Sequence, residues 1–354
     1  MTGAALPEIT LELVPRARYD VIDIARRLRD EHGDVLGRYP KVCYCSHHTT
    51  AGYLEQSLGS RLGRSGGVDP YIQVFQTLFP PDVDYHHDKL HLRQELSEAQ
   101  RQCEPRNADS HLAFISSGLR NCVTYVNRPG AAVYFIDLDG VNHGTTRRRQ
   151  TTILPFRRER VVERVALEVP VSGHPIDSIN LRDPRTGLYE RLNELIARRG
   201  VAKGRVDLWL PVGERSAGLT VNEYETLLMR HDLAEVLRDP LRFVAEKWRH
   251  MVADPRAIPD KAIEYAKYDL VRVANTLMDA LGVSESMLER LVARFLALPA
   301  ARFLRMKRSV SLLVSDRSGT GSIVQGPYQS PILVQWKKAP RQARRLEVAI
   351  TEFS

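Results

Sequence analysis

The chain has 354 residues, of which 27% are charged and 43% apolar, a composition typical of a globular protein with room for two domains. It contains no apolar run of the roughly 20 residues that a membrane span needs, and its first residues lack the charged and then apolar pattern of a signal peptide. We therefore expect a cytoplasmic protein with no membrane partner. The four cysteines include no CxxC pair, which argues against a zinc site built from thiolates.

The net charge of +8 comes from arginine pairs and runs scattered along the chain, such as Arg147-Arg148-Arg149. A basic protein first suggests nucleic acid as a partner. These arginines, however, are accompanied by no platform of interleaved aromatic residues and by no known nucleic-acid-binding motif. An anionic small molecule, for example a phosphate compound, fits them at least as well, because guanidinium groups match phosphate oxygens. We expect such a small molecule as the partner, and no nucleic acid.

The first half of the chain contains short alternating apolar runs, typical of strands, and segments with apolar residues at helical spacing. The predicted strands cover residues 9–13, 42–45, 131–138 and 147–156, and the predicted helices cover residues 21–29, 70–78 and 90–102. The second half retraces this order. Its predicted strands cover residues 165–169, 207–210, 332–336 and 346–350, and its predicted helix covers residues 188–198.

One turn of the first half returns in the second half. The stretch Ser46-His47-His48-Thr49-Thr50-Ala51-Gly52 follows a predicted strand, and Gly213-Glu214-Arg215-Ser216-Ala217-Gly218 follows the corresponding strand of the second half. Glu214 stands where the first copy has His48. We infer that one module occurs twice and that only the first copy keeps the histidine. The two predicted domains are residues 1–160 and 161–354.

The second copy also carries a long insertion with apolar residues at helical spacing, over residues 233–298. Its expected role is additional packing between domains or subunits, with a lid over the site as the alternative. The join between the copies, residues 157–164, is charged and has neither glycine nor proline. We therefore expect the two domains to pack tightly against each other.

Three histidines of the first copy are candidate metal ligands: His48, His87 and His111. Neutral imidazole is a common ligand of zinc and iron, and three imidazoles with an open fourth position describe a catalytic metal site. No pair among them has the i,i+4 spacing of a helical metal motif. The spacing alone therefore leaves open whether the three share one metal.

The motifs around these histidines, in their order along the chain, resemble those of the YjbQ-type family, known as secondary thiamine-phosphate synthases. They are His48-Thr49-Thr50-Ala51-Gly52, Asp69-Pro70, Tyr85-x-His87, Asn107-Ala108-Asp109-Ser110-His111-Leu112, and the basic run at Arg147. The resemblance implies an α+β fold of antiparallel sheets backed by helices, and a metal site formed by the three histidines. Family members are usually single modules of about half this length that assemble as trimers.

The second half resembles the same family through other motifs. Ala217-Gly218-Leu219-Thr220-Val221-Asn222-Glu223 is close to the family's A-G-L-T-I-N-E, and Gly326-Pro327-Tyr328-Gln329 stands where the family has G-T-W-Q. The family's lysine after the third histidine motif is Ala113 here, and the first copy has no G-T-W-Q. The chain is thus similar to two tandem YjbQ-like modules, the second one degenerate and carrying the helical insertion.

The first copy keeps the histidines and the second keeps the polar family residues, which suggests a composite site. In this hypothesis Asp137, Glu223 and Gln329 are the catalytic candidates, Asp137 being a possible base or metal ligand. The alternative is that Asn222, Glu223 and Gln329 only make structural hydrogen bonds. The predicted substrate-binding residues are Thr49, Thr50, Asn107, Arg147 and Arg149.

The function expected first is a metal-dependent enzyme acting on a phosphorylated or otherwise anionic small molecule. The family resemblance implies a transfer that displaces diphosphate, as when a pyrimidine diphosphate joins a thiazole phosphate. One alternative is a non-haem iron oxygenase or lyase with a three-His or two-His-one-Asp site. Another is a non-catalytic binding protein. The expected cofactor is a divalent metal, zinc or iron before magnesium, and the expected assembly is a homo-oligomer, a dimer or a trimer.

Overall fold

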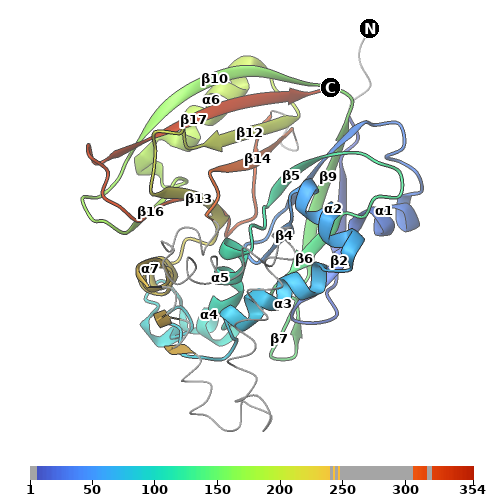
Figure 1. The fold of residues 1–354 in the computed structure, drawn as a ribbon. Coiled ribbons are helices and arrows are strands. Elements are labelled where there is room, and N and C mark those ends of the chain that lie inside the picture. The colour runs from blue at the N-terminus through green and yellow to red at the C-terminus, as the bar shows by residue number, and fades with distance from the viewer. Residues whose placement is uncertain (1–5, 240–241, 244–245, 248–305, 317–320) are drawn as a thin grey trace, which may run out of the picture. The chain divides into compact units, whose positions relative to one another are not determined.

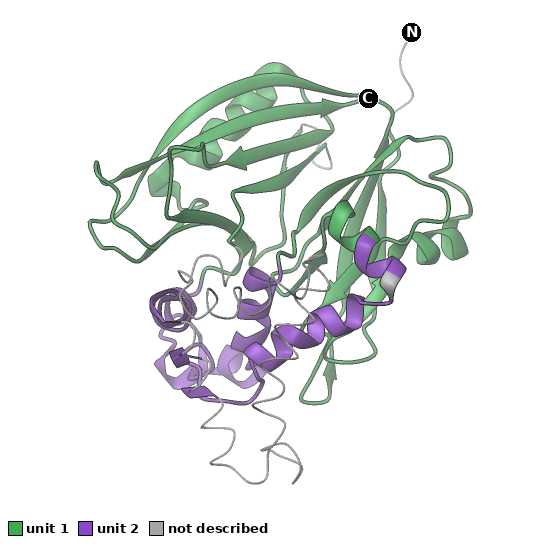
Figure 2. Ribbon diagram, in the orientation of Figure 1, with its two compact units in different colours: residues 1–60, 118–224, 306–354 green, residues 61–117, 225–305 purple. Residues whose placement is uncertain are grey.

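The computed structural model describes residues 6–239, 242–243, 246–247, 306–316 and 321–354 (Figure 1). The chain divides into two compact units (Figure 2). Unit 1 comprises Met1–Ser60, Gly118–Tyr224 and Met306–Ser354, and unit 2 comprises Arg61–Ser117 and Glu225–Arg305. Every strand of the described residues belongs to unit 1, while unit 2 is built from helices and loops. Within the described residues no helix combines the length and apolar character needed to cross a membrane.

The first copy contributes two antiparallel sheets to unit 1. The larger has the order β1 (Ile9–Leu13), β9 (Arg149–Phe156), β3 (Lys41–Ser46), β5 (Cys122–Val126). The smaller has the order β2 (Asp20–Asp23), β6 (Tyr134–Asp137), β4 (Ala51–Tyr53). A short ribbon pairs β7 (Val141–Asn142) with β8 (Thr145–Thr146).

The second copy repeats both sheets. Its larger sheet has the order β10 (Glu159–Pro170), β17 (Ala343–Phe353), β12 (Gly204–Trp209), β14 (Ser309–Ser315), β15 (Ser322–Val324). Its smaller sheet has the order β11 (Asp177–Asn180), β16 (Ser330–Gln335), β13 (Ala217–Asn222). Apart from the added edge strand β15, each strand has a counterpart in the first copy at the same place in the sheet. The topology therefore repeats along the chain, and the predicted α+β class of antiparallel sheets with helices is confirmed.

One helix in each copy follows the second strand: α1 (Ile24–His32) in the first and α6 (Leu188–Arg199) in the second. Residues 21–23, which the sequence predicted as helical, belong to β2 instead. The helix begins only at Ile24, because the Asp23 carboxylate accepts the backbone N–H groups of Ala25 and Arg26 and so caps the first turn. A short 3₁₀ turn, η2 (Pro184–Thr186), precedes α6, which ends at Gly200 in a left-handed conformation.

The two copies share one hydrophobic cluster inside unit 1. Phe156 at the end of β9 stacks on Phe353 near the end of β17, with ring centroids 3.9 Å apart. Cys43 and Cys45, two residues apart on β3, are buried in the same cluster. The last strand of the first copy, β9, ends at Phe156, and β10 of the second copy begins at Glu159. The sheets of both copies lie in unit 1.

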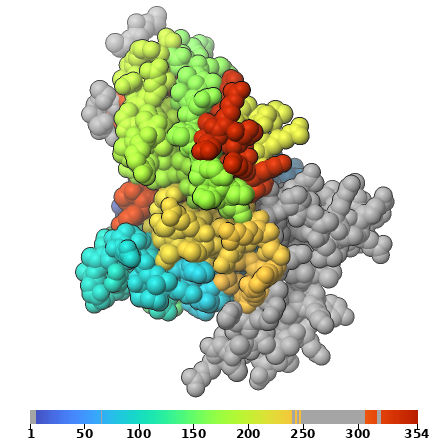
Figure 3. Space-filling model, turned by 90° about the vertical axis from the view of Figure 1, so that its left-hand side faces the viewer, coloured from blue at the N-terminus to red at the C-terminus, as the bar shows by residue number. Residues whose placement is uncertain are grey.

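Unit 2 is formed by the equivalent connections of the two copies, between β4 and β5 and between β13 and β14. The first connection contains α2 (Gln56–Ser65), whose first residues still belong to unit 1, then α3 (Val68–Leu78), η1 (Leu90–Leu92), α4 (Glu98–Cys103) and α5 (Ala108–Ser116). The second contains a π-helical turn, η3 (Leu228–Asp232), and α7 (Leu233–Arg238). The two connections adjoin on one face of the molecule, in cyan and in yellow to orange (Figure 3).

Two predictions for these connections need correction or restriction. The helix expected over residues 90–102 is only the 3₁₀ turn η1 and the short α4, because Ser97 caps α4 in a capping box with Gln100 and so starts a new helix there. The helical insertion expected over residues 233–298 is helical in its described beginning, which starts earlier, at Leu228. Most of its remainder, from residue 248 on, lies outside the described residues.

Candidate functional site

The histidine turn of the first copy, residues 46–50, joins β3 to β4 in unit 1. The Ser46 hydroxyl closes it by donating to the Ala51 carbonyl at 2.7 Å and by accepting the His48 backbone N–H at 3.3 Å. The His48 ring nitrogen Nε2 accepts the backbone N–H of Gln150 at 2.6 Å, which assigns the ring proton to Nδ1. Burial, with the nearby charge of Arg149, lowers the pKa of His48 to about 3, so its imidazole is neutral at physiological pH.

The second copy holds this turn in place through two polar side chains. The Gln329 side-chain amide donates to the carbonyls of Ser46 at 3.0 Å and His48 at 2.7 Å. The Asn222 amide donates to the Thr49 carbonyl at 3.1 Å. Both side chains are almost completely buried. They therefore make hydrogen bonds to the backbone of the turn, the structural role that was the alternative to catalysis.

Behind the turn lies a buried ion pair between Arg149 and Asp137. Arg149 donates from Nε to Asp137 Oδ2 at 2.6 Å and from its terminal nitrogen to Oδ1 at 2.8 Å. It also donates to the Asp139 carbonyl at 2.8 Å and to the Thr50 hydroxyl at 3.3 Å. Burial raises the pKa of Asp137, and the Arg149 charge opposes that rise. The carboxylate and the guanidinium group are thus bonded to each other, and the Arg149 bond to Thr50 connects the turn to β9.

The other two candidate histidines, His87 and His111, lie side by side in unit 2. Their ring centroids are 5.2 Å apart, and both side chains are buried. His111 belongs to α5, in which every side chain is buried, and its backbone N–H donates to the Asn107 carbonyl at 3.2 Å. His87 lies in the loop before η1. Two imidazoles are thus brought together from positions 24 residues apart in the numbering.

Asp88 positions both of these histidines. Its carboxylate oxygen Oδ1 lies 2.9 Å from His87 Nδ1 and accepts the backbone N–H of Ala108, in the first turn of α5, at 3.1 Å. A carboxylate at Nδ1 requires the ring proton there, which leaves the lone pair of His87 on Nε2. Asp88 therefore orients the His87 ring. Asp84 pairs instead with Lys89 at 3.0 Å.

The predicted site residues therefore fall in both units. Three of them belong to unit 2, namely His87, His111 and Asn107. The others belong to unit 1, namely His48, Thr49, Thr50, Asp137, Arg147, Arg149, Glu223 and Gln329. Arg147 is half-buried and pairs with Asp139 at 3.1 Å, and the Glu223 backbone N–H donates to the Asn222 side chain at 2.8 Å. A centre made of all three histidines stays a prediction from the sequence.

Sequence reasoning missed Asp232 and Glu235, two carboxylates of the second connection in unit 2. Each oxygen of the Asp232 carboxylate accepts a backbone N–H, that of His86 and that of His87, both at 2.9 Å. The spacing His231-Asp232-x-x-Glu235 at the start of the predicted insertion was the available signal, since acids three residues apart share one face of a helix.

No protein-family model and no curated protein matches the chain. Among solved structures, the chain is similar to a YbjQ-like protein of unknown function from Sulfolobus solfataricus P2, at 17% identity and a TM-score of 0.30, over 55% of this chain and 99% of that chain. It is also similar to a hypothetical protein from Aeropyrum pernix K1, at 17% identity and a TM-score of 0.29, over 53% of this chain and 98% of that chain. A third structure is an uncharacterized conserved protein of the YjbQ/UPF0047 family from Clostridium acetobutylicum, at 14% identity and a TM-score of 0.27, over 52% of this chain and 98% of that chain.

Proposed function

We propose that the protein is a metal-dependent enzyme acting on an anionic small molecule, with His87 and His111 as metal ligands. The observation that carries this proposal is the pair of buried imidazoles 5.2 Å apart in unit 2. The donor set fits zinc or iron, because both metals bind neutral imidazole, and magnesium, which prefers oxygen ligands, fits less well.

The Asp88 carboxylate supports this assignment. Metal-binding histidines usually donate their second ring N–H to a carboxylate or carbonyl, which fixes the tautomer and the ring orientation. Asp88 does this for His87 and, through the Ala108 N–H, also fixes the start of the helix that carries His111.

A bound metal would supply Lewis acidity toward a phosphate oxygen, or would activate water. The net charge of +8 favours an anionic substrate. The reaction proposed within this class is the family's transfer, in which a thiazole phosphate joins a pyrimidine diphosphate and diphosphate leaves. The two-His-one-Asp iron site of the oxygenase alternative receives no support from Asp137, because the bidentate contact with Arg149 occupies both of its carboxylate oxygens.

Elemental analysis of the purified protein and of three variants tests the proposal. We expect His87→Asn and His111→Asn each to lower the bound zinc or iron and to abolish diphosphate release from the two family substrates. His174→Asn, at an exposed histidine, serves as the matched control and should retain both properties. Metal content that is the same in all three variants and the wild type would refute the metal site. Full metal loss without any effect on turnover would refute only the catalytic role.

A further inference from the structure

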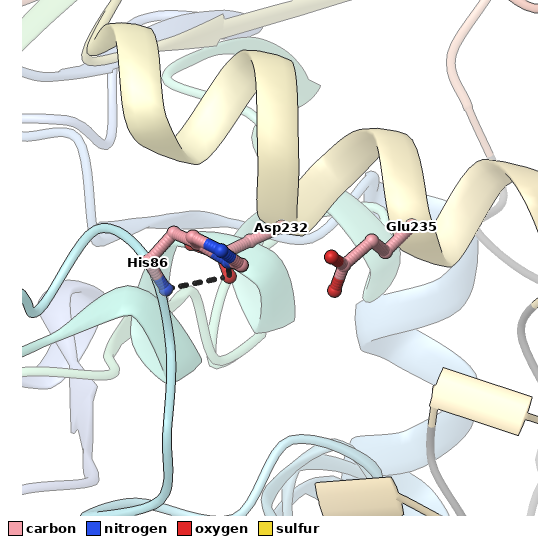
Figure 4. Close-up of side chains that lie close together, drawn as sticks. All are labelled: His86, Asp232 and Glu235. Carbon is pink, nitrogen blue, oxygen red and sulfur yellow. Dashed lines mark hydrogen bonds and ion pairs between the residues drawn. The ribbon is translucent and has the colours of Figure 1, made fainter.

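A second group of ligand-type side chains lies in unit 2, beside the His87 loop. His86, Asp232 and Glu235 each offer one ligand atom, and these atoms all lie within 4.8 Å of one another. Figure 4 shows His86 on its loop and the two carboxylates on one helical segment, with the Glu235 side chain directed toward the other two. The group therefore joins the connection of the first copy to that of the second.

The local fold brings the two carboxylates to the same side. Asp232 is the last residue of the π-helical turn η3, and Glu235 lies three residues further on, in α7. Residues three apart on a helix are neighbours on its surface, and π-helical turns occur frequently at functional sites. The turn therefore places the carboxylate oxygens of Asp232 and Glu235 close to the ring of His86, which belongs to another segment.

The Asp232 carboxylate is held rigidly and away from water. Its side chain is fully buried, and its two oxygens accept the N–H groups of His86 and His87 at 2.9 Å each. Each N–H bond uses only one acceptor site of its oxygen, so both oxygens of the carboxylate keep capacity to ligate a cation.

The separation between His86 and Asp232 matches two ligands of one ion. His86 Nδ1 lies 3.5 Å from Asp232 Oδ1, longer than a hydrogen bond. Two ligand atoms at the usual zinc distances in a tetrahedral site lie about 3.4 Å apart. His86 Nδ1 is shielded from solvent and has no hydrogen-bond partner among the residues that the structure describes. The His231 ring stacks on the His86 ring at 4.7 Å and fixes its plane.

We propose that His86, Asp232 and Glu235 bind a divalent transition-metal ion, with zinc as the best fit to one imidazole and two carboxylates. The ion links the connections of the two copies and so stabilises unit 2. Its three ligands are different residues from His87 and His111, and the proposal does not rest on the proposed enzymatic function.

The test counts zinc ions per chain and measures zinc affinity by competition with a chromophoric chelator. The variants are Glu235→Gln and His86→Gln, which remove one ligand each, with Glu190→Gln on the exposed face of α6 as the matched control. A third variant, His111→Asn, removes a ligand of the other proposed site. Circular dichroism and the Tm in excess chelator check that each variant folds like the wild type.

We expect Glu235→Gln and His86→Gln each to lower the affinity for one zinc ion per chain by about tenfold or more, as loss of a metal contact does. Both variants should also lose the rise in Tm that zinc gives the wild type. Glu190→Gln and His111→Asn should keep this equivalent. If Glu235→Gln and His86→Gln bind zinc with wild-type number and affinity, or if the wild type binds no zinc sensitive to them, the site does not exist. Loss of zinc in His111→Asn alone would support the other site and refute this one.

Discussion

His48 and Glu214 occupy equivalent positions in the two copies, and each accepts a backbone N–H from the strand that closes its own sheet. His48 Nε2 accepts from Gln150 in β9 at 2.6 Å, and Glu214 Oε1 accepts from Arg345 in β17 at 2.8 Å. Each acceptor lies three residues before the strand that follows its turn. The fold therefore requires a side-chain acceptor at this position, whatever chemistry the residue also performs.

Removal of that acceptor should destabilise the protein. We expect His48→Ala to lower the free energy of unfolding by about 0.5–1.5 kcal/mol, because the Gln150 N–H loses its partner. His48→Gln keeps an acceptor oxygen and should recover part of that loss. Urea denaturation of both variants measures the effect. Equal stability of His48→Ala and the wild type would show that the contact contributes nothing to folding.

His48 should also make the stability depend on pH. Its pKa is lowered to about 3 in the folded chain, mainly by burial, against about 6.5 when unfolded. The unfolded chain therefore binds the extra proton between these values, so stability is full above pH 6.5 and falls as the pH drops toward 3. The slope from this one group is about 1.4 kcal/mol per pH unit. The free energy of unfolding, measured between pH 7 and 4, should depend less on pH in His48→Gln than in the wild type. An unchanged pH dependence would contradict the assignment.

The close approach of Gly326 to the histidine turn gives a steric prediction. A Cβ at Gly326 would lie 1.9 Å from the His47 carbonyl oxygen, whereas one at Gly213 would meet no atom within 4 Å. We expect Gly326→Ala to cost at least about 1–3 kcal/mol, as overpacking does, and Gly213→Ala to stay within about 0.5 kcal/mol. Thermal unfolding of the two variants compares them directly. Equal Tm values would mean that the turn can move away without cost.

Substitution of Gln329 distinguishes a structural role of its side chain from a catalytic one. Its two donated bonds hold the Ser46 and His48 carbonyls, so Gln329→Ala should destabilise the protein by about 1–3 kcal/mol. Gln329→Glu should cost more, because a carboxylate would face two carbonyl oxygens. The readout is stability beside turnover at a temperature where both variants are folded. If a fully folded Gln329 variant lost turnover, the result would support the composite catalytic site instead.

Asp88 gives a prediction for the proposed metal centre. Asp88→Asn keeps the shape but removes the charge that fixes the His87 tautomer, so metal affinity should fall by about 10–100-fold. Asp84→Asn is the matched control, because the Asp84 carboxylate pairs with Lys89 at the surface. Competition with a chelator measures both affinities. An Asp88→Asn variant that binds metal as tightly as the control would remove this carboxylate from the proposed centre.

The sequence predicted the sheets better than the helical unit, for physical reasons. Strands such as Ile9–Leu13 alternate strictly between buried and exposed positions, and that period is visible in the residues themselves. The echo of Ala51-Gly52 in Ala217-Gly218 marked the duplication, which the strand order repeats. Turn chemistry was missed where a polar residue began a helix, as Ser97 does in α4.

Contacts far apart in the sequence were beyond such reasoning. The Asp232 carboxylate meets the N–H of His87 from 145 positions along the chain, and no local pattern encodes this pairing. The Asp88 contact with His87 was foreseeable because the two residues are adjacent. For the same reason the histidine turn was identified, while the amides of Gln329 and Asn222 that hold it were foreseen only as one of two alternatives.

The stack of Phe156 on Phe353 has a consequence for how this chain can evolve. A single module ending at its closing strand would expose one of these rings to water, whereas the fused copies cover both. Once the rings share a cluster, a change of size in one copy must be matched in the other. The two copies are therefore expected to evolve together, because the core of the histidine-bearing copy is completed by a side chain of the second copy.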